Sequence, residues 1–138
     1  MLVGYETITE DLTPFEETKA LPLIVVGLRS KVGKANSITG TEIVRKINES
    51  GRLGSYKLTG PKLRKMISAI RLHYNVYGLR GVLSWSKGYY VAQTSEEYKE
   101  CLESLNQRLR QQSLIVGALY DQSILFTLNK RFDGEEKK

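Results

Sequence analysis

Few residues of this chain could carry out catalysis, and their spacing matches no reaction centre. His73 and Cys101 are the only histidine and the only cysteine among the 138 residues, so neither a zinc cluster nor a disulfide can form within one chain. The paired glutamates at 16–17 and 96–97 lie where helices are expected to begin, and negative charge is favourable at a helix N-terminus. We therefore predict no enzymatic activity, no cofactor and no metal site.

One stretch is faintly similar to a phosphate-binding loop. In residues 27–34 the two glycines are one residue further apart than in that loop, and Ala35 follows the lysine where a magnesium-binding Ser or Thr is needed. Gly33 is instead well placed to end a helix. The sequence therefore predicts no nucleotide-binding site here.

The positive charge of the chain is concentrated in its middle. The net charge is +6, but residues 29–87 hold thirteen Lys or Arg and two Glu, a net charge of +11. Residues 1–28 have a net charge of −4, and residues 88–138 have a net charge of −1. Such asymmetry favours a polyanionic partner, with a solvated basic surface as the alternative.

Two elements within this basic segment are predicted to form the binding surface. The first is a helix over residues 59–74, capped by Thr59. Its apolar face is formed by Leu63, Met66, Ile67, Ile70 and Tyr74. The second is a β-hairpin with strands at 82–85 and 89–92, in which Gly88 should adopt a positive φ at the end of a three-residue turn. The hairpin aromatics Trp85, Tyr89 and Tyr90 are expected to pack in the core, with stacking on unpaired bases as the alternative.

The candidate DNA-binding residues lie on and just before these two elements. Lys62, Lys65 and Ser68 are on the outer side of the first helical turns, from which a recognition helix reaches base edges. Arg64 and Arg71 lie on one flank, which suits phosphates or a structural pair with an acid, and the hairpin tip suits a backbone or minor-groove contact. The full set is Lys57, Thr59, Lys62, Arg64, Lys65, Ser68, Arg71, Ser86 and Lys87.

The first helix is predicted from its start signal. A capping box at residues 13–16 should begin it, and Pro22 should kink or restart it. Residues 23–28 should continue as a buried helix to about Val32, with a short buried strand as the alternative.

A second helix is predicted between this one and the basic helix. A capping box at residues 39–42 begins it, it should end at about Ser50, and Ile38 before it could take part in strand pairing. Residues 48–56 are then expected to be a loop, which is longer than the turn of a minimal helix-turn-helix.

A long C-terminal helix should begin at Thr94, which starts a third capping box. From Tyr98 to Phe126 a stripe with alternating steps of four and three residues forms a heptad pattern, which predicts a homodimer. The dimerisation residues are Leu102, Leu105, Leu109, Gln112, Val116 and Leu119. A helix packed back on its own domain is the alternative.

The order of these elements resembles winged-helix proteins of phage and prophage genomes. The residues that carry the resemblance are those at 63–67 (Leu-Arg-Lys-Met-Ile), 86–92 (Ser-Lys-Gly-Tyr-Tyr-Val-Ala) and 95–97 (Ser-Glu-Glu). In such proteins a Lys-Gly-Tyr-Tyr wing is followed by a Glu-rich helix start and a long C-terminal helix. The resemblance spans about residues 13–112 and implies binding of double-stranded DNA in phage regulation or replication.

We therefore predict a mainly α fold with a small β-hairpin wing (α+β), a winged helix-turn-helix with a long C-terminal helix. Its parts would be an acidic arm (1–12), a winged-helix domain (13–93), a C-terminal helix (94–131) and a charged tail (132–138). A protein–protein interaction or assembly module that does not bind DNA is the alternative function. With neither a leader nor a membrane-length apolar run in the sequence, a cytoplasmic location in a bacterial or phage-infected cell and no membrane partner are expected.

Overall fold

The structure is a computed structural model that describes the backbone of residues 12–136 and the side chains of residues 12–129. The predicted acidic arm, apart from its last residue, lies outside the described residues. The chain divides into two compact units, Met1–Cys101 and Leu102–Lys138. The boundary falls inside one helix, two turns after its start.

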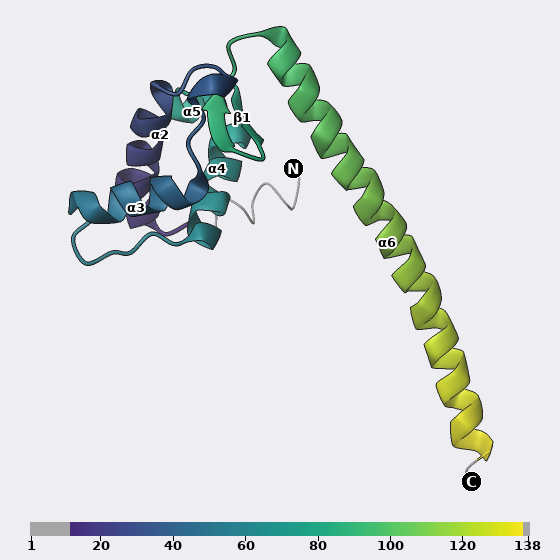
Figure 1. The fold of residues 1–138 in the computed structure, drawn as a ribbon. Coiled ribbons are helices and arrows are strands. Elements are labelled where there is room, and N and C mark those ends of the chain that lie inside the picture. Colours follow the sequence, from purple (N-terminus) through teal and green to yellow (C-terminus); the bar gives the residue numbers. More distant parts are fainter. Residues whose placement is uncertain (1–11, 137–138) are drawn as a thin grey trace. The chain divides into compact units, whose positions relative to one another are not determined.

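The fold is mainly helical with one small hairpin, which confirms the predicted α+β class (Figure 1). The elements in chain order are the π-helix η1 (Glu16–Ala20), α2 (Leu21–Arg29), the 3-10 helix η2 (Lys34–Asn36), α3 (Gly40–Ser50), α4 (Gly60–Leu72), α5 (Tyr74–Tyr77), β1 (Val82–Trp85), β2 (Gly88–Val91) and α6 (Ser95–Glu136). All of them except most of α6 belong to the first unit.

The first helical segment begins at the predicted capping box. The amide of Thr13 donates to Oε1 of Glu16 at 2.8 Å, and the amide of Glu16 donates to Oγ1 of Thr13 at 3.1 Å. At Pro22 the helix restarts rather than breaks, because the π-helical turn η1 runs directly into α2, whose first turn contains the proline. A π-turn accommodates a proline that lacks a backbone donor and crowds the preceding turn.

The segment after α2 corrects one prediction. The helix ends at Arg29 rather than at about Val32, and Val32 forms a parallel bridge with Val91 of β2. Gly33, at φ +88°, donates its amide to the carbonyl of Val91 instead of ending the helix. The helix predicted for residues 23–28 is therefore confirmed, whereas the β-branched Val32 pairs with a strand.

The hairpin pairs β1 with β2 in antiparallel register. Because Trp85 pairs with Gly88, the turn has two residues rather than the predicted three, but Gly88 does take a positive φ, of +120°. The predicted pairing of Ile38 is confirmed. Its amide donates to the Tyr89 carbonyl at 2.9 Å, and the Tyr89 amide donates to the Ile38 carbonyl at 2.8 Å. β2 thus has backbone partners along both of its edges.

α3 and the loop after it are held at defined points. Oγ1 of Thr39 accepts the Glu42 amide, and Gly51 ends the helix with φ +71°. The helix thus ends at Ser50, as predicted, and the loop begins at Gly51 rather than at residue 48. Its far end is fixed by Asn48, whose side chain accepts the amide of Leu58 at 2.8 Å and donates to the carbonyl of Leu58 at 3.0 Å.

α4 forms as predicted over most of its length. Thr59 caps it, and the side chains of Leu63, Met66, Ile67 and Ile70 are at most 2% exposed. Tyr74 does not belong to this apolar face, because α4 ends at Leu72 and Tyr74 begins the short helix α5, where it is 42% exposed. The predicted helix was therefore too long by two residues at its C-terminal end.

The core of the first unit joins α2, α4 and the hairpin. The largest fully buried side chains are Leu21, Ile24, Leu28, Leu58, Leu63, Met66, Ile67, Ile70 and Tyr90. A smaller cluster under the hairpin contains Leu83, Tyr90 and Cys101. Core packing is thus confirmed for Tyr90, while Trp85 and Tyr89 are half-buried.

α6 is one continuous helix that starts at the predicted capping box. The amide of Glu97 donates to Oγ1 of Thr94 at 3.2 Å, and Oε1 of Glu97 accepts the Thr94 amide at 3.1 Å. The helix continues to Glu136, past the predicted end at residue 131. Every side chain of residues 102–129 is exposed.

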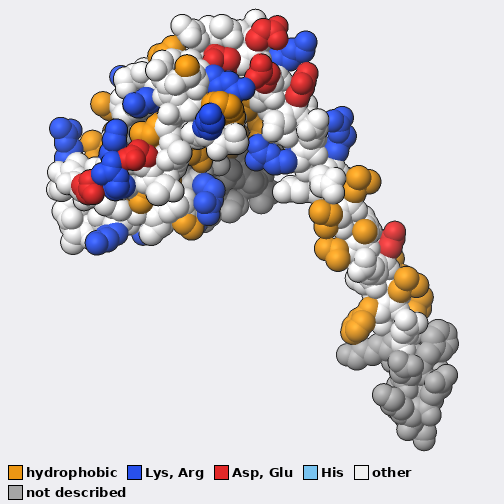
Figure 2. Space-filling model, viewed as in Figure 1, with side chains coloured by type: hydrophobic (Ala, Val, Ile, Leu, Met, Phe, Trp, Pro, Cys, Tyr) orange, Lys and Arg blue, Asp and Glu red, His pale blue; other side chains and the backbone are white. Residues whose placement is uncertain are grey.

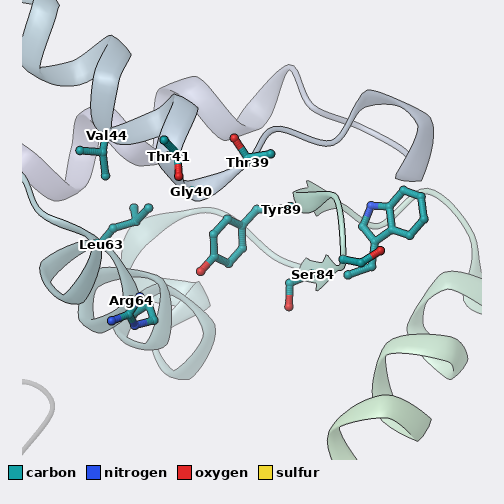
Figure 3. Close-up of a pocket in the computed structure, with 12 residues that line it drawn as sticks. Thr39, Gly40, Thr41, Val44, Leu63, Arg64, Ser84 and Tyr89 are labelled. Atoms are coloured by element: carbon teal, nitrogen blue, oxygen red, sulfur yellow. The ribbon is translucent and has the colours of Figure 1, made fainter.

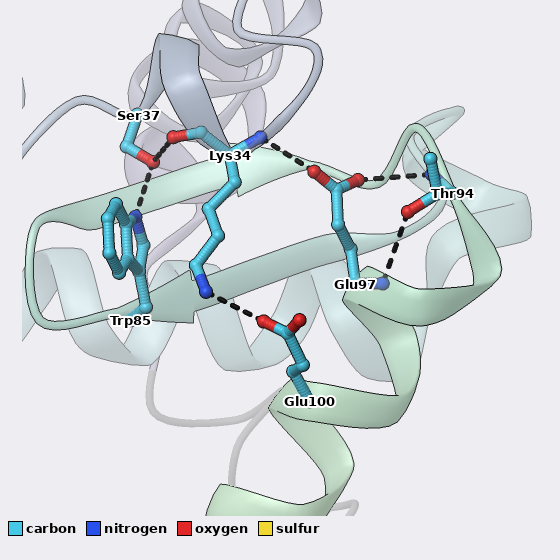
Figure 4. Close-up of polar contacts among 6 residues, drawn as sticks. All are labelled: Lys34, Ser37, Trp85, Thr94, Glu97 and Glu100. Carbon is cyan, nitrogen blue, oxygen red and sulfur yellow. Dashed lines mark hydrogen bonds and ion pairs between the residues drawn. The ribbon is translucent and has the colours of Figure 1, made fainter.

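Contacts within the first unit fix the first turns of α6 (Figure 4). Oε2 of Glu97 accepts the amide of Lys34 at 2.8 Å, and Nζ of Lys34 donates to Oε2 of Glu100 at 2.7 Å. Hydrogen bonds from the backbone amides of Gln93 and Lys34 hold the pKa of Glu97 below its ordinary value. Glu97 therefore links the helix start to the segment that pairs with the hairpin.

Candidate nucleic-acid interface

The outer side of α4 carries the predicted basic residues. Lys62, Arg64 and Lys65 are exposed and Ser68 is half-buried, while Thr59 is used as the helix cap. Lys57 is exposed in the loop before the helix. Figure 2 shows Lys and Arg side chains spread over the visible face of the first unit, with acidic side chains among them.

Lys62 lies beside an aromatic and acidic neighbourhood. Its Nζ is 4.7 Å from the centre of the Tyr56 ring, and the Tyr56 hydroxyl donates to Oε2 of Glu16 at 2.6 Å. Burial and the Glu16 carboxylate raise the pKa of Tyr56. Burial also opposes ionisation of Glu16, but hydrogen bonds from Thr13 and Tyr56 outweigh it and lower the pKa of Glu16. Lys62 therefore faces a carboxylate that stays ionised.

Arg71 has a structural role at the hairpin. Its Nε donates to the carbonyl of Val82 at 2.8 Å, and its Nη2 donates to Oγ of Ser84 at 3.1 Å. Arg71 thus pairs with a carbonyl and a hydroxyl group, and not with an acidic side chain, which was one of the alternatives that the sequence suggested. Since both partners belong to β1, Arg71 fixes the direction of the hairpin relative to α4.

The hairpin turn presents an exposed cation beside an indole ring. Ser86 and Lys87 are exposed, and Nζ of Lys87 lies 5.5 Å from the centre of the Trp85 ring. Nζ of Lys34 lies 4.4 Å from the same ring, and Nε1 of Trp85 donates to Oγ of Ser37 at 2.6 Å. Two ammonium groups are therefore held over one fixed aromatic ring.

A groove of about 440 Å³ lies where α3, α4 and the hairpin meet. Thr39 and Thr41 come from the start of α3, Arg64 comes from α4, and Ser84 and Tyr89 come from the hairpin (Figure 3). The Tyr89 ring points from the hairpin into the space between the two helices. The groove thus combines a helix N-terminus, hydroxyl groups and a guanidinium group.

Four of the nine predicted site residues line two separate hollows. Arg64 and Ser86 line the groove at the hairpin, whereas Lys62 and Lys65 line a separate hollow with Phe15, Tyr56 and other residues of the first unit. Sequence reasoning did not find Thr41 or Lys34. The capping box at 39–42 predicted the start of α3, but no local signal indicated that this start lies beside the hairpin.

Comparison of the chain with protein-family models, curated proteins and solved structures finds no match. In the described part of the chain, no helix combines the length and the apolar character needed to cross a membrane. Among the same residues, no group of three or more His, Cys, Asp or Glu is placed to hold a metal ion.

Proposed function

We propose that this chain is a winged helix-turn-helix protein that binds double-stranded DNA. In this proposal α4 is the recognition helix, and the turn at Ser86 and Lys87 is the tip of the wing. The observation that carries it is the set of exposed basic side chains on α4, of which Arg64 shares a groove with Ser86 of the turn, with the hairpin fixed to α4 by Arg71. Its biological setting, phage regulation or replication, rests on the family resemblance alone.

The order and packing of the elements support this proposal. α3 packs on α4, the hairpin follows α4 after the short helix α5, and the segment between α2 and α3 pairs with β2 through Ile38 and Val32. The loop between α3 and α4 is longer than in a minimal helix-turn-helix, but Asn48 holds its end at Leu58. The start of α4 is therefore fixed despite the length of the loop.

The groove beside Arg64 suits a backbone phosphate. The first turn of α3 has amides without intrahelical partners, and Thr41 in this turn is exposed. A phosphate bound there would position α4 along the duplex, while Lys65 and Ser68 on the outer side of α4 would face base edges. Affinity would then depend on phosphate contacts, and sequence preference would depend on the helix.

We further propose that the protein is a homodimer through α6. The stripe residues Leu102, Leu105, Leu109, Val116 and Leu119 are between 39% and 66% exposed. Gln112 interrupts the stripe, and a polar residue at such a position sets register at some cost in stability. Two copies would present two recognition helices, as binding to two half-sites requires.

The test is binding of the full chain to a short duplex of arbitrary sequence at several salt concentrations, followed by fluorescence anisotropy. We expect affinity to fall steeply with salt. Lys65→Glu combined with Lys87→Glu should weaken binding and reduce the salt slope by about one unit for each lost phosphate contact.

The matched control is Lys19→Glu combined with Lys46→Glu. These two exposed lysines lie outside the proposed interface, and the net charge changes by the same amount. A nonspecific effect of net charge would weaken both double variants equally and would contradict the placement of the interface. If the unchanged protein does not bind duplex DNA even at low salt, the interaction-module alternative replaces this proposal.

A further inference from the structure

The second half of the exposed part of α6 carries a second apolar seam. Leu114, Ala118, Asp121, Leu125 and Leu128 follow one another in steps of four, three, four and three residues, which is the spacing of the first stripe. Leu114, Leu125 and Leu128 are 70%, 59% and 42% exposed. Figure 2 shows hydrophobic side chains standing out along this part of α6.

The two seams lie on opposite sides of the helix. Each residue turns an α-helix by about 100°, so Leu114, two residues after Gln112 and two before Val116, faces away from the first stripe. A two-stranded coiled coil through the first stripe would leave this second seam in water. The helix is therefore apolar on more sides than a dimer can cover.

The second seam has a sharp beginning. Continued toward the N-terminus at the same spacing, it would contain Glu100, Ser104, Gln107 and Gln111, which are all polar. Residues 102–111 thus have one apolar stripe and a polar remainder, as an ordinary coiled-coil surface has. Only residues 114–128, about 21 Å of helix, have two apolar sides.

We propose that this second seam joins dimers of the chain to one another, so that the protein assembles beyond the dimer in steps of one dimer. The inference rests on the proposed dimer through the first stripe. A second copy fits the seam because it supplies a partner of the same length and heptad spacing. Two seams on opposite sides of one helix do not close into a ring, so the association continues with concentration.

The charges of this segment favour a second copy over a lipid surface. Between Arg110 and Lys130 there is no Lys or Arg, and Asp121 is the only charged residue. Helices that lie on membranes carry Lys and Arg on a polar face. This segment has neither Lys nor Arg. A nearly neutral partner with matching apolar positions is what another copy of the segment offers.

Asp121 keeps the association weak. It lies at the centre of the second seam, with two apolar positions on each side. In a symmetric pairing of two copies, the two Asp121 carboxylates come together, and burying like charges is unfavourable. Asp121→Asn, which removes the charge at nearly constant shape, should therefore strengthen assembly by tenfold or more in the dissociation constant of the dimers.

The experiment is sedimentation of the full chain over a range of micromolar concentrations. We expect dimers to give way to tetramers and larger species as concentration rises. Leu114→Gln combined with Leu125→Gln should leave only dimers, with unchanged helical circular dichroism and unchanged affinity for a short duplex. The matched control, Gln107→Ser combined with Gln111→Ser, keeps the same side of the helix polar before the seam and should assemble like the unchanged protein.

Each result bears on a different part of the reasoning. A dimer at every concentration, which Asp121→Asn also fails to enlarge, overturns the second seam but leaves the dimer through the first stripe. A monomer at every concentration contradicts that dimer as well. If phosphatidylcholine vesicles bind the unchanged protein and not the Leu114/Leu125 variant, and no tetramer forms, lipid rather than a second copy covers the seam.

Discussion

Replacing Gly88 by alanine should disrupt the contact between the hairpin and the start of α3. Gly88 has φ +120°, a region that residues with a side chain rarely adopt. A Cβ atom at this position would overlap the carbonyl oxygen of Ile38 and lie 2.7 Å from the amide nitrogen of Thr39. Both neighbours are backbone atoms, so the clash is relieved only by moving β2 away from the segment that contains Ile38 and Thr39.

The magnitude follows from two contributions to the free energy of unfolding. The strained φ costs about 1–3 kcal/mol. Separation of β2 from the segment at Ile38 would weaken the two backbone hydrogen bonds between Ile38 and Tyr89, each of which contributes about 0.5–1.5 kcal/mol. We therefore expect Gly88→Ala to lower the free energy of unfolding by about 2–6 kcal/mol.

Urea denaturation of Gly88→Ala beside Gly51→Ala isolates the effect of the clash. Gly51 also has a positive φ, of +71°, but a Cβ atom there would meet nothing within 4 Å. Gly51→Ala should therefore lower the free energy of unfolding only by the cost of the strained φ. A loss of stability no larger in Gly88→Ala than in Gly51→Ala would refute the proposed role of the close approach to Ile38. Weaker DNA binding in Gly88→Ala at temperatures where it stays folded would further link the hairpin to binding.

Three further outcomes are expected. Asn48→Ala removes both hydrogen bonds to Leu58 and should lower the free energy of unfolding by about 1–3 kcal/mol in urea denaturation; an unchanged midpoint would contradict the clamp. The pKa of Glu16 is lowered in the folded state, so the ionised carboxylate contributes its full stabilisation above pH 4.5, and this contribution is lost as the pH falls through the folded-state pKa. The difference in free energy of unfolding between the unchanged protein and Glu16→Gln should therefore become smaller as the pH is lowered. A difference that does not change with pH would contradict the lowered pKa. Leu105→Ala and Leu109→Ala should each weaken the proposed dimer by about 2–5 kcal/mol in sedimentation, whereas a variant that dimerises normally would show that the stripe is not the interface.

Local signals in the sequence predicted the starts of the helices. The capping residues Thr13, Thr39, Thr59 and Thr94 all accept the hydrogen bonds expected of them. Such signals are reliable because the cap and the amide that it accepts are only three residues apart, so the rest of the fold has little influence. The hairpin strands were also predicted, from their β-branched and aromatic residues.

Contacts between distant residues could not be predicted in the same way. The bridge between Val32 and Val91 overrides the helical tendency after Arg29, and nothing near Val32 indicates its partner. Arg71 was assigned a place on the binding flank because helical spacing gives the side of a residue but not what packs against that side. The groove at Arg64 likewise depends on how three separate elements meet.

The hydrogen bond from Arg71 to Val82 also determines what the outer edge of β1 can do. The Val91 amide donates to the Lys31 carbonyl, and the Val91 carbonyl accepts the Gly33 amide, so Val91 makes no backbone hydrogen bond to Val82, the residue opposite it in the hairpin. In an antiparallel pair of this kind, the backbone groups of Val82 also point outward, away from β2. Arg71 occupies the carbonyl on that open edge, and the strand is only four residues long. Another chain therefore finds little room to add a strand there, and the hairpin can be crowded against its neighbours without edge-to-edge aggregation.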